Sequence, residues 1–464
     1  MEVRTAHFSV VSDVGEKRAS DIARRCEQLR AAFSTLMNRA TTNDPAPLLI
    51  FAVNGERELA ELAGEKNRNS THAGLFVSGA DENFVLIDAS DDPWAPAFHE
   101  YAHELLTANT SSNVQTWFDE GFAEYFSTFD TSGQRAELGR VPTGKLQFLR
   151  RNGKLLRLAD LVGVNRNSEI YNRNGPSREM FYGESWLLVH YLFDHQLIDR
   201  AEPFFNLMAT GTPLDDAIQK AFGASTLKLE DELLSYAKGE RFRFFSVPAA
   251  RDRSRESVNV QPLTEVMVAA LKAEVRWHGK IVHSAPEIAE YTTEFKSLLA
   301  RDPNNSVALR GLGRALLELK DYDGSLRYLR QAVESDPKDV QNHHSLSLLL
   351  SAIEESGSSR AGRGYSSRSE AEACVQVFPS FADAYRLIAF WFERQGEFDK
   401  AEGMMRKAVL LSPRSEGYEL NLANIELTRH EYGSALTLLR ELKRSSNPEI
   451  STRAEYLSSN IAKE

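Results

Sequence analysis

The sequence has few cysteines, no long apolar run and no excess of positive charge, and each absence excludes a class of protein. Only Cys26 and Cys374 occur in 464 residues, so a disulfide framework is excluded, and both are expected to be ordinary buried residues. No run of eighteen apolar residues exists, which argues against a membrane-spanning helix in this sequence. A net charge of −11 argues against nucleic acid as the main partner, because phosphate binding needs a basic surface.

The chain does contain two histidines at a spacing that suits a metal ion. In the segment His99-Glu100-Tyr101-Ala102-His103, the imidazoles stand four residues apart and therefore share one face of a helix. Such a pair can hold one Zn²⁺ while Glu100 reaches a water molecule beside it as a general base. The alternative is a helix whose histidines only pack or cap.

A second predicted helix offers carboxylates to the same site. It carries the segment TWFDEGFAEYF, in which Glu120 and Glu124 lie four residues apart and so on one side. Glu120 would complete a shell of two histidines and one glutamate with a fourth position open for water. Glu124 would accept the spare N–H of a coordinating imidazole. A solvated acidic face is the alternative, and the surrounding aromatic residues make it a poor one.

The two segments together resemble the gluzincins, the zinc metallopeptidases of the thermolysin and aminopeptidase N type. In that group an HExxH helix is followed by a glutamate ligand in a WxxEGxA context. The resemblance implies His99, His103 and Glu120 as ligands of one zinc ion per chain, with Glu100 as the base. The spacing is two residues shorter than in aminopeptidase N, which a loop can absorb.

The same group places a tyrosine at the start of a later helix to stabilise the oxyanion. The segment MFYGESWLLVHYL offers Tyr182 for this role, sixty-two residues after Glu120. A tyrosine that only packs at the helix start is the alternative. His190, eight residues further along the helix, is the second candidate donor.

A weaker match lies before the histidines. The segment GADEN, residues 79–83, is similar to the aminopeptidase strand that binds a free amine through Glu82, but it lies too close to His99. The flanking residues predict a β-hairpin with a polar turn instead. Backbone groups of residues 74–77 could then hold an extended peptide by strand addition.

The predicted organisation is an α+β zincin-like domain followed by an all-α solenoid. Residues 1–240 begin with a strand (7–13), a helix (15–39), a strand (47–54), a short helix (56–64) and the hairpin, and continue as helices. Residues 241–262 lose periodicity and predict a linker. The resulting domains are 1–240, the linker 241–262 and a repeat domain 263–464.

The repeat domain is indicated by prolines at a regular period. They follow one another at 34, 42, 34 and 35 residues, close to the period of a tetratricopeptide repeat, at Pro303, Pro337, Pro379, Pro413 and Pro448. Four to five repeats are expected, with a polar insertion near residues 354–368. His343 and His344 are expected to be surface or packing residues. The concave face of such an array commonly holds peptides or partner proteins.

These features favour a zinc metallopeptidase whose repeats recruit a peptide or protein substrate, or a partner. Two alternatives remain: a catalytically inactive zincin-like domain that serves an interaction scaffold, and zinc-dependent hydrolysis of a different amide or an ester. The chain starts in a predicted strand, with no room for a signal peptide. It is therefore either cytoplasmic or, as related architectures favour, exported to a place such as the periplasm after loss of a leader.

Overall fold

A mixed sheet begins the chain, as the sequence predicts, and it has six strands. The computed structural model describes residues 1–37, 48–63, 74–78, 83–110, 114–132, 134–249, 258–278, 283–356, 366–445 and 447–461. The strand order is β4-β5-β3-β2-β1-β9, with β2, β3 and β5 parallel and the other pairs antiparallel. The strands are β1 (Glu2–Arg4), β2 (Phe8–Ser12), β3 (Leu48–Val53), β4 (Gly74–Ser78), β5 (Asn83–Asp88) and β9 (Asn259–Gln261).

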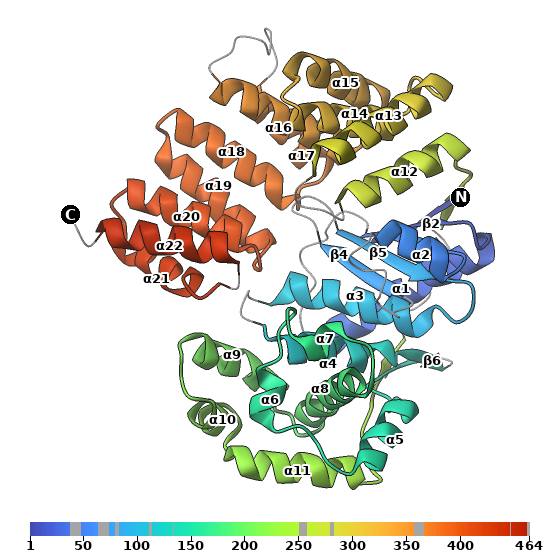
Figure 1. Ribbon diagram of the computed structural model, residues 1–464, viewed down its shortest axis with the longest axis vertical. Coiled ribbons are helices and arrows are strands. Elements are labelled where there is room, and N and C mark those ends of the chain that lie inside the picture. The colour runs from blue at the N-terminus through green and yellow to red at the C-terminus, as the bar shows by residue number, and fades with distance from the viewer. Residues whose placement is uncertain are drawn as a thin grey trace.

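Alternate residues of the central strands point to opposite faces of this sheet, and helices cover both faces. Ile50 and Ala52 of β3 pack in the core that also contains α1 (Glu16–Met37) and α3 (Trp94–Asn109). Phe51 and Val53 pack on the other face, with α2 (Glu56–Ala63) and with residues of α12 (Glu265–His278). Period-2 alternation thus sets the two layers, and Figure 1 shows α3 beside the sheet.

The hairpin and the short helices lie close to their predicted positions. Strands β4 and β5 pair with Ser78 opposite Asn83. The segment between them, which includes Glu82, lies outside the described residues. Helix α10 (Leu214–Phe222) ends at Gly223, whose φ of +73° is a conformation that favours glycine. Helix α11 (Thr226–Lys238) follows it.

Below α3 lies a second layer, which is mainly helical (Figure 1). It includes a three-stranded sheet in the order β6-β7-β8. Its remaining elements are α4 (Thr116–Ser127), β6 (Asp130–Ser132), β7 (Arg135–Leu138), α5 (Thr143–Asn152), α6 (Leu158–Val162), α7 (Glu169–Asn172), α8 (Pro176–Asp194), η2 (Ile198–Arg200), α9 (Ala201–Ala209) and β8 (Phe245–Pro248).

Two short parts of the segment expected to be a linker, 241–262, are strands of the two sheets. Strand β8 pairs with β7, and β9 pairs with β1 at the edge of the large sheet. Each strand has only three or four residues, which is too short to show a hydrophobic period in the sequence. A separate connecting segment is therefore the wrong description of residues 245–248 and 259–261.

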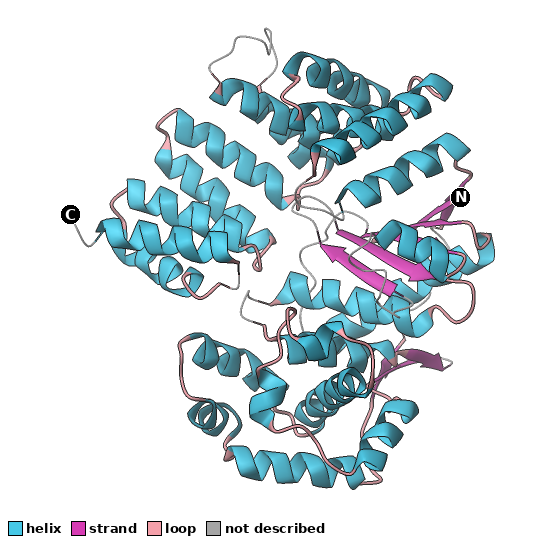
Figure 2. Cartoon of the chain, in the orientation of Figure 1, coloured by secondary structure: helices cyan, strands magenta, loops and turns pink. Residues whose placement is uncertain are grey.

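The rest of the chain is an array of helical hairpins, and the predicted all-α tetratricopeptide region is confirmed (Figure 2). The array curves so that its last hairpins lie near the end of α3. Its helices are α12 (Glu265–His278), α13 (Ala285–Arg301), α14 (Ser306–Glu318), α15 (Tyr322–Ser335), α16 (Val340–Glu355), α17 (Ser367–Val377), α18 (Ala382–Arg394), α19 (Phe398–Leu411), α20 (Glu416–Thr428), α21 (Tyr432–Leu442) and α22 (Pro448–Ile461).

The expected insertion falls between α16 and α17, and residues 357–365 within it lie outside the described part of the chain. Helices α16 and α17 still pack against each other as one hairpin. None of the described helices is both long and apolar enough to cross a membrane.

Candidate metal centre

The two histidines share one face of α3, as the helical spacing predicts. Phe98, Ala102 and Leu105 are buried on the same helix, and this burial fixes how the helix is turned. His99 and His103 then face α4, and their Nε2 atoms lie 3.3 Å apart. Two imidazole nitrogens at this separation can contact a common ion.

Glu120 of α4 lies opposite this pair. Its Oε2 atom is 3.4 Å from Nε2 of His99 and 3.7 Å from Nε2 of His103. Oε2 is buried and accepts no hydrogen bond from the described residues. A buried carboxylate oxygen normally has a partner, so this atom fits a cation between the three side chains. The structure thus brings together the three residues that the sequence predicts as ligands.

The charges around the site favour a cation. Burial acts to raise the pKa of Glu120, but the charge of His103 and the contact with His99 lower it below its usual range. Burial acts to lower the pKa of His103, yet the Asp119 and Glu120 carboxylates raise it to about 9. The site therefore concentrates negative charge beside the imidazoles, where a divalent ion would compete with protons.

Asp119 orients His103, and the sequence did not single it out. Its Oδ1 atom lies 3.0 Å from Nδ1 of His103, and its Oδ2 atom accepts a hydrogen bond from Arg166 at 2.9 Å. A carboxylate on the second ring nitrogen fixes the tautomer of a coordinating histidine. Only its position beside Glu120 in the chain could have indicated Asp119.

Glu124, expected in this orienting role, lies beside the other histidine. Its Oε1 atom is 3.8 Å from Nδ1 of His99, which is too long for a direct hydrogen bond. The same oxygen forms an ion pair with Lys145 at 2.9 Å. Glu124 is therefore near the predicted nitrogen but is engaged mainly with Lys145.

Glu100 points toward the edge strand β4. Its Oε2 atom accepts a hydrogen bond from the backbone N–H of Phe76 at 2.7 Å. A Cβ atom added at Gly74 would lie 2.9 Å from Cγ of Glu100, so glycine lets the strand pass close to the carboxylate. Burial raises the pKa of Glu100, which favours its protonated form.

Two tyrosines, Tyr171 and Tyr182, lie near Glu120. The hydroxyl of Tyr171, in the short helix α7, donates to Oε1 of Glu120 at 2.8 Å. Tyr182, the predicted donor, lies in the second turn of α8 and stacks on the ring of Tyr171, with centroids 6.3 Å apart. Its hydroxyl is 3.4 Å from Nη2 of Arg178. Tyr171 stands in no recognisable motif, so only the folded structure reveals its contact.

His190, the second candidate donor, belongs to the core. Nδ1 lies 2.8 Å from the hydroxyl of Tyr236 and Nε2 lies 2.9 Å from the backbone oxygen of Gly139. The side chain is fully buried, and burial lowers its pKa. Both ring nitrogens are engaged, so His190 has none to offer a substrate.

A second group of carboxylates in the described chain has a different environment. Glu402, Glu426 and Glu431 lie close together in the array, but Arg406 and Arg429 form ion pairs with them. The arginines supply the positive charge that a metal ion would otherwise bring.

The remaining histidines singled out in the sequence are packing residues. His343 lies 2.8 Å from a carboxylate oxygen of Glu370, and His344 lies 2.7 Å from one of Asp383. Each is buried beside a single acidic residue. Cys26 and Cys374 are likewise buried and free, as expected.

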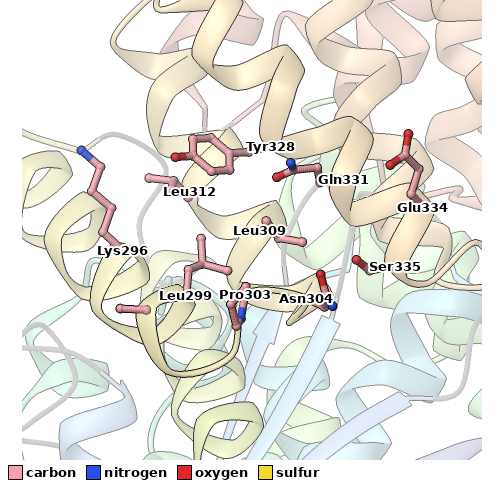
Figure 3. A pocket seen from close by; sticks show the side chains of 11 residues that line it. Lys296, Leu299, Pro303, Asn304, Leu309, Leu312, Tyr328, Gln331, Glu334 and Ser335 are labelled. Atoms are coloured by element: carbon pink, nitrogen blue, oxygen red, sulfur yellow. The ribbon is translucent and has the colours of Figure 1, made fainter.

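A cavity of about 800 Å³ lies in the array, away from the candidate metal centre. Figure 3 shows Leu299, Leu309 and Leu312 along its floor and Tyr328 above them. Lys296 and Glu334 stand at opposite ends of its rim. No metal-ligating cluster of the described residues coincides with this cavity.

Comparisons with known proteins match the two halves separately. A tetratricopeptide repeat family matches residues 293–349. A family described as a protein of unknown function (DUF1570) matches residues 95–215, which contain the candidate metal centre and Tyr182. No curated protein matches the chain.

Three similar solved structures each cover about two fifths of this chain. A thermophilic tetratricopeptide-repeat protein of Thermus thermophilus is 20% identical with a TM-score of 0.33, covering 41% of this chain and 92% of its own. MamA of Desulfovibrio magneticus is 17% identical with a TM-score of 0.31, covering 43% and 98%. YrrB, described as having an unusual peptide-binding site, is 12% identical with a TM-score of 0.31, covering 41% and 92%. The family match and the helical hairpins show that this chain carries a tetratricopeptide-repeat region.

Proposed function

We propose that the N-terminal unit, residues 1–240, is a zincin-like domain that hydrolyses peptide bonds with one zinc ion. The observation that carries this proposal is the buried Oε2 atom of Glu120, which faces Nε2 of both His99 and His103. Two histidines and one glutamate are a donor set of catalytic zinc sites. The resemblance to gluzincins supports the same ligands.

A zinc ion held by these residues would act as a Lewis acid and lower the pKa of a water molecule beside it. Glu100 follows His99 on the same buried helix, and we assign it the proton transfer from water to the leaving amine. Asp119 holds the ring of His103, so the imidazole keeps its orientation during the reaction.

Tyr182 is the proposed donor to the oxyanion. Its neighbour Tyr171 donates to Glu120, whereas Tyr182 lies near the start of α8, where the resemblance to gluzincins indicates the donor. Burial raises the pKa of Tyr182 far above its usual value, so the phenol keeps its proton at neutral pH. A protonated phenol can donate to a developing negative charge.

The substrate class follows from the edge strand and the array. Strand β4 has a described neighbour, β5, on one side only, and it passes directly over Glu100. An extended peptide added along β4 would bring its scissile bond near the candidate metal centre. Tetratricopeptide arrays commonly bind peptides or proteins, and we assign this array the recruitment of a substrate or partner.

The decisive experiment compares the full-length protein with Glu100→Gln. We expect close to one zinc per chain in both, measured by elemental analysis, and cleavage of a mixed peptide library by the wild type alone. Glu402→Gln is the matched control, because it makes the same change in the other acidic cluster and should retain both properties. Equal cleavage by the wild type and Glu100→Gln would refute the assigned base.

The second candidate function is an interaction scaffold with an inactive zincin-like domain. It is favoured by the hydrogen bond from the Phe76 N–H to Glu100, which engages one of the two carboxylate oxygens available to a general base. The repeats also match a described family, whereas the family that matches residues 95–215 is of unknown function. In that case the wild type would bind a partner through the array and cleave no peptide in the library.

A further inference from the structure

The C-terminal half of the array touches the helix that carries both histidines. Arg414, in the loop between α19 and α20, donates to Oγ1 of Thr110 from Nε at 3.0 Å and from Nη2 at 2.7 Å. A third hydrogen bond runs from Nη1 to Oγ1 of Thr107 at 3.2 Å. The partners are more than 300 residues apart in the sequence. Figure 1 shows the last hairpins near this end of α3.

Arg414 reaches the last turn of α3, just before the connection to α4. A helix presents unpaired carbonyl groups at its C-terminal end, where a cation is favourable. The forked guanidinium donates to two hydroxyl groups one turn apart from separate nitrogen atoms, which a single ammonium group cannot do. The contact therefore fixes the C-terminal end of α3, which carries two of the proposed ligands, just before the chain continues to α4, which carries the third.

We propose that Arg414 is a positioning residue through which the tetratricopeptide array holds α3 and α4 in the arrangement that binds metal. Its guanidinium fastens the C-terminal end of α3, from which the chain continues to α4. The catalytic consequence rests on the proposed zinc-dependent function. The contact between the array and α3 does not depend on that function.

The test uses the full-length protein with Arg414→Met, which keeps the length of the side chain and removes its charge and donors. Arg394→Met is the matched control, because Arg394 bonds only within the array in the contacts described, to Ser351, Glu354, Glu355 and Ser367. Zinc affinity is measured by competition with a chelator, and amide exchange is followed at residues 106–110. We expect Arg414→Met to weaken zinc binding by about tenfold, the lower end for losing an outer partner of a ligand. Exchange should rise at the end of α3, and Arg394→Met should change neither quantity.

Two further variants keep the proposal falsifiable if Arg414→Met folds poorly. Thr110→Val removes the main acceptor from the other side, and Arg414→Lys should recover part of the affinity as the conservative change. In a double-mutant cycle, Thr110→Val combined with Arg414→Met should cost no more than the larger single effect. Fully additive losses would mean that the two residues act separately, and would overturn the proposal.

The outcomes separate this proposal from the proposed function. If the wild type binds no zinc, the zinc proposal fails while the exchange measurement still tests the contact. Increased amide exchange at residues 106–110 in Arg414→Met would then support the coupling between the array and α3. Unchanged exchange together with unchanged zinc affinity would overturn it.

Discussion

Replacing Gly121 with alanine should disturb the candidate metal centre by separating two helices. Gly121 follows Glu120 on α4, where the helix packs against α8. A Cβ atom at this position would lie 2.2 Å from the backbone oxygen of Ser185 and 2.8 Å from Cγ2 of Val189. A backbone oxygen cannot rotate away, so restoring even a 3.0 Å separation requires about 0.8 Å of movement (3.0 − 2.2).

The expected cost follows from two opposing effects. Overpacking of a well-packed interface costs about 1–3 kcal/mol, and a rigid backbone contact belongs near the upper end. Alanine in place of glycine in a helix gains about 1 kcal/mol. We therefore expect the free energy of unfolding of the N-terminal unit to fall by about 2 kcal/mol. Zinc affinity should fall as well, since metal–ligand distances tolerate only about 0.2 Å.

The assay measures urea-dependent amide exchange in peptides from α4 and α8, together with zinc affinity by chelator competition. Gly403→Ala is the matched control, because this exposed glycine of α19 has no heavy atom within 4 Å of its added Cβ. That variant should gain up to about 1 kcal/mol. If Gly121→Ala were as stable as the control and bound zinc normally, the close packing of α4 on α8 would not be what places Glu120.

Two further predictions concern Glu184 and the tyrosines. Burial and the nearby charge of Glu230 raise the pKa of Glu184 to about 8, although its carboxylate accepts a hydrogen bond from the N–H of Leu156. The protonated Glu184 contributes fully to stability below the unfolded pKa of 4.5, and this contribution is lost as the pH rises through 8. The free energy of unfolding of the wild type should therefore decline over this range by at most about 5 kcal/mol, and Glu184→Gln should remove the decline. Urea titrations of both proteins from pH 5 to 9 in chelator test this, and parallel curves would contradict it. Tyr182→Phe should lower turnover by about 10²-fold to 10³-fold with little change in substrate affinity. Tyr171→Phe should mainly weaken zinc binding, and an unchanged rate in Tyr182→Phe would remove that residue from the proposed mechanism.

Helical spacing and repeat period were sufficient to predict much of the architecture. The four-residue spacing of His99 and His103 places both rings on one face, and the proline period of about 34 residues marks the hairpins of the array. Both patterns repeat over many residues, so the sequence records them. Strands β8 and β9 are too short to leave such a pattern.

The contacts that the sequence did not reveal join segments distant in the chain. Tyr171 meets Glu120 across 51 residues, and Arg414 meets Thr110 across 304. Neither contact leaves a period or a fixed spacing, because the folded packing alone brings the partners together. Asp119 could not be predicted for a different reason, because the metal-ligand pattern of the sequence includes its neighbour Glu120 and does not include Asp119.

Two contacts between the array and the N-terminal unit, among the described residues, have a thermodynamic consequence. At one end α12 packs on the sheet, with an ion pair between Lys272 and Glu58. At the other end Arg414 holds α3. The curvature of a solenoid is the sum of small rotations between neighbouring repeats. An array held at both places therefore cannot change its curvature without straining these contacts. If a bound partner loosens the Arg414 contact, zinc affinity falls by some factor, and zinc must then weaken partner binding by the same factor, because coupling between two binding sites is reciprocal.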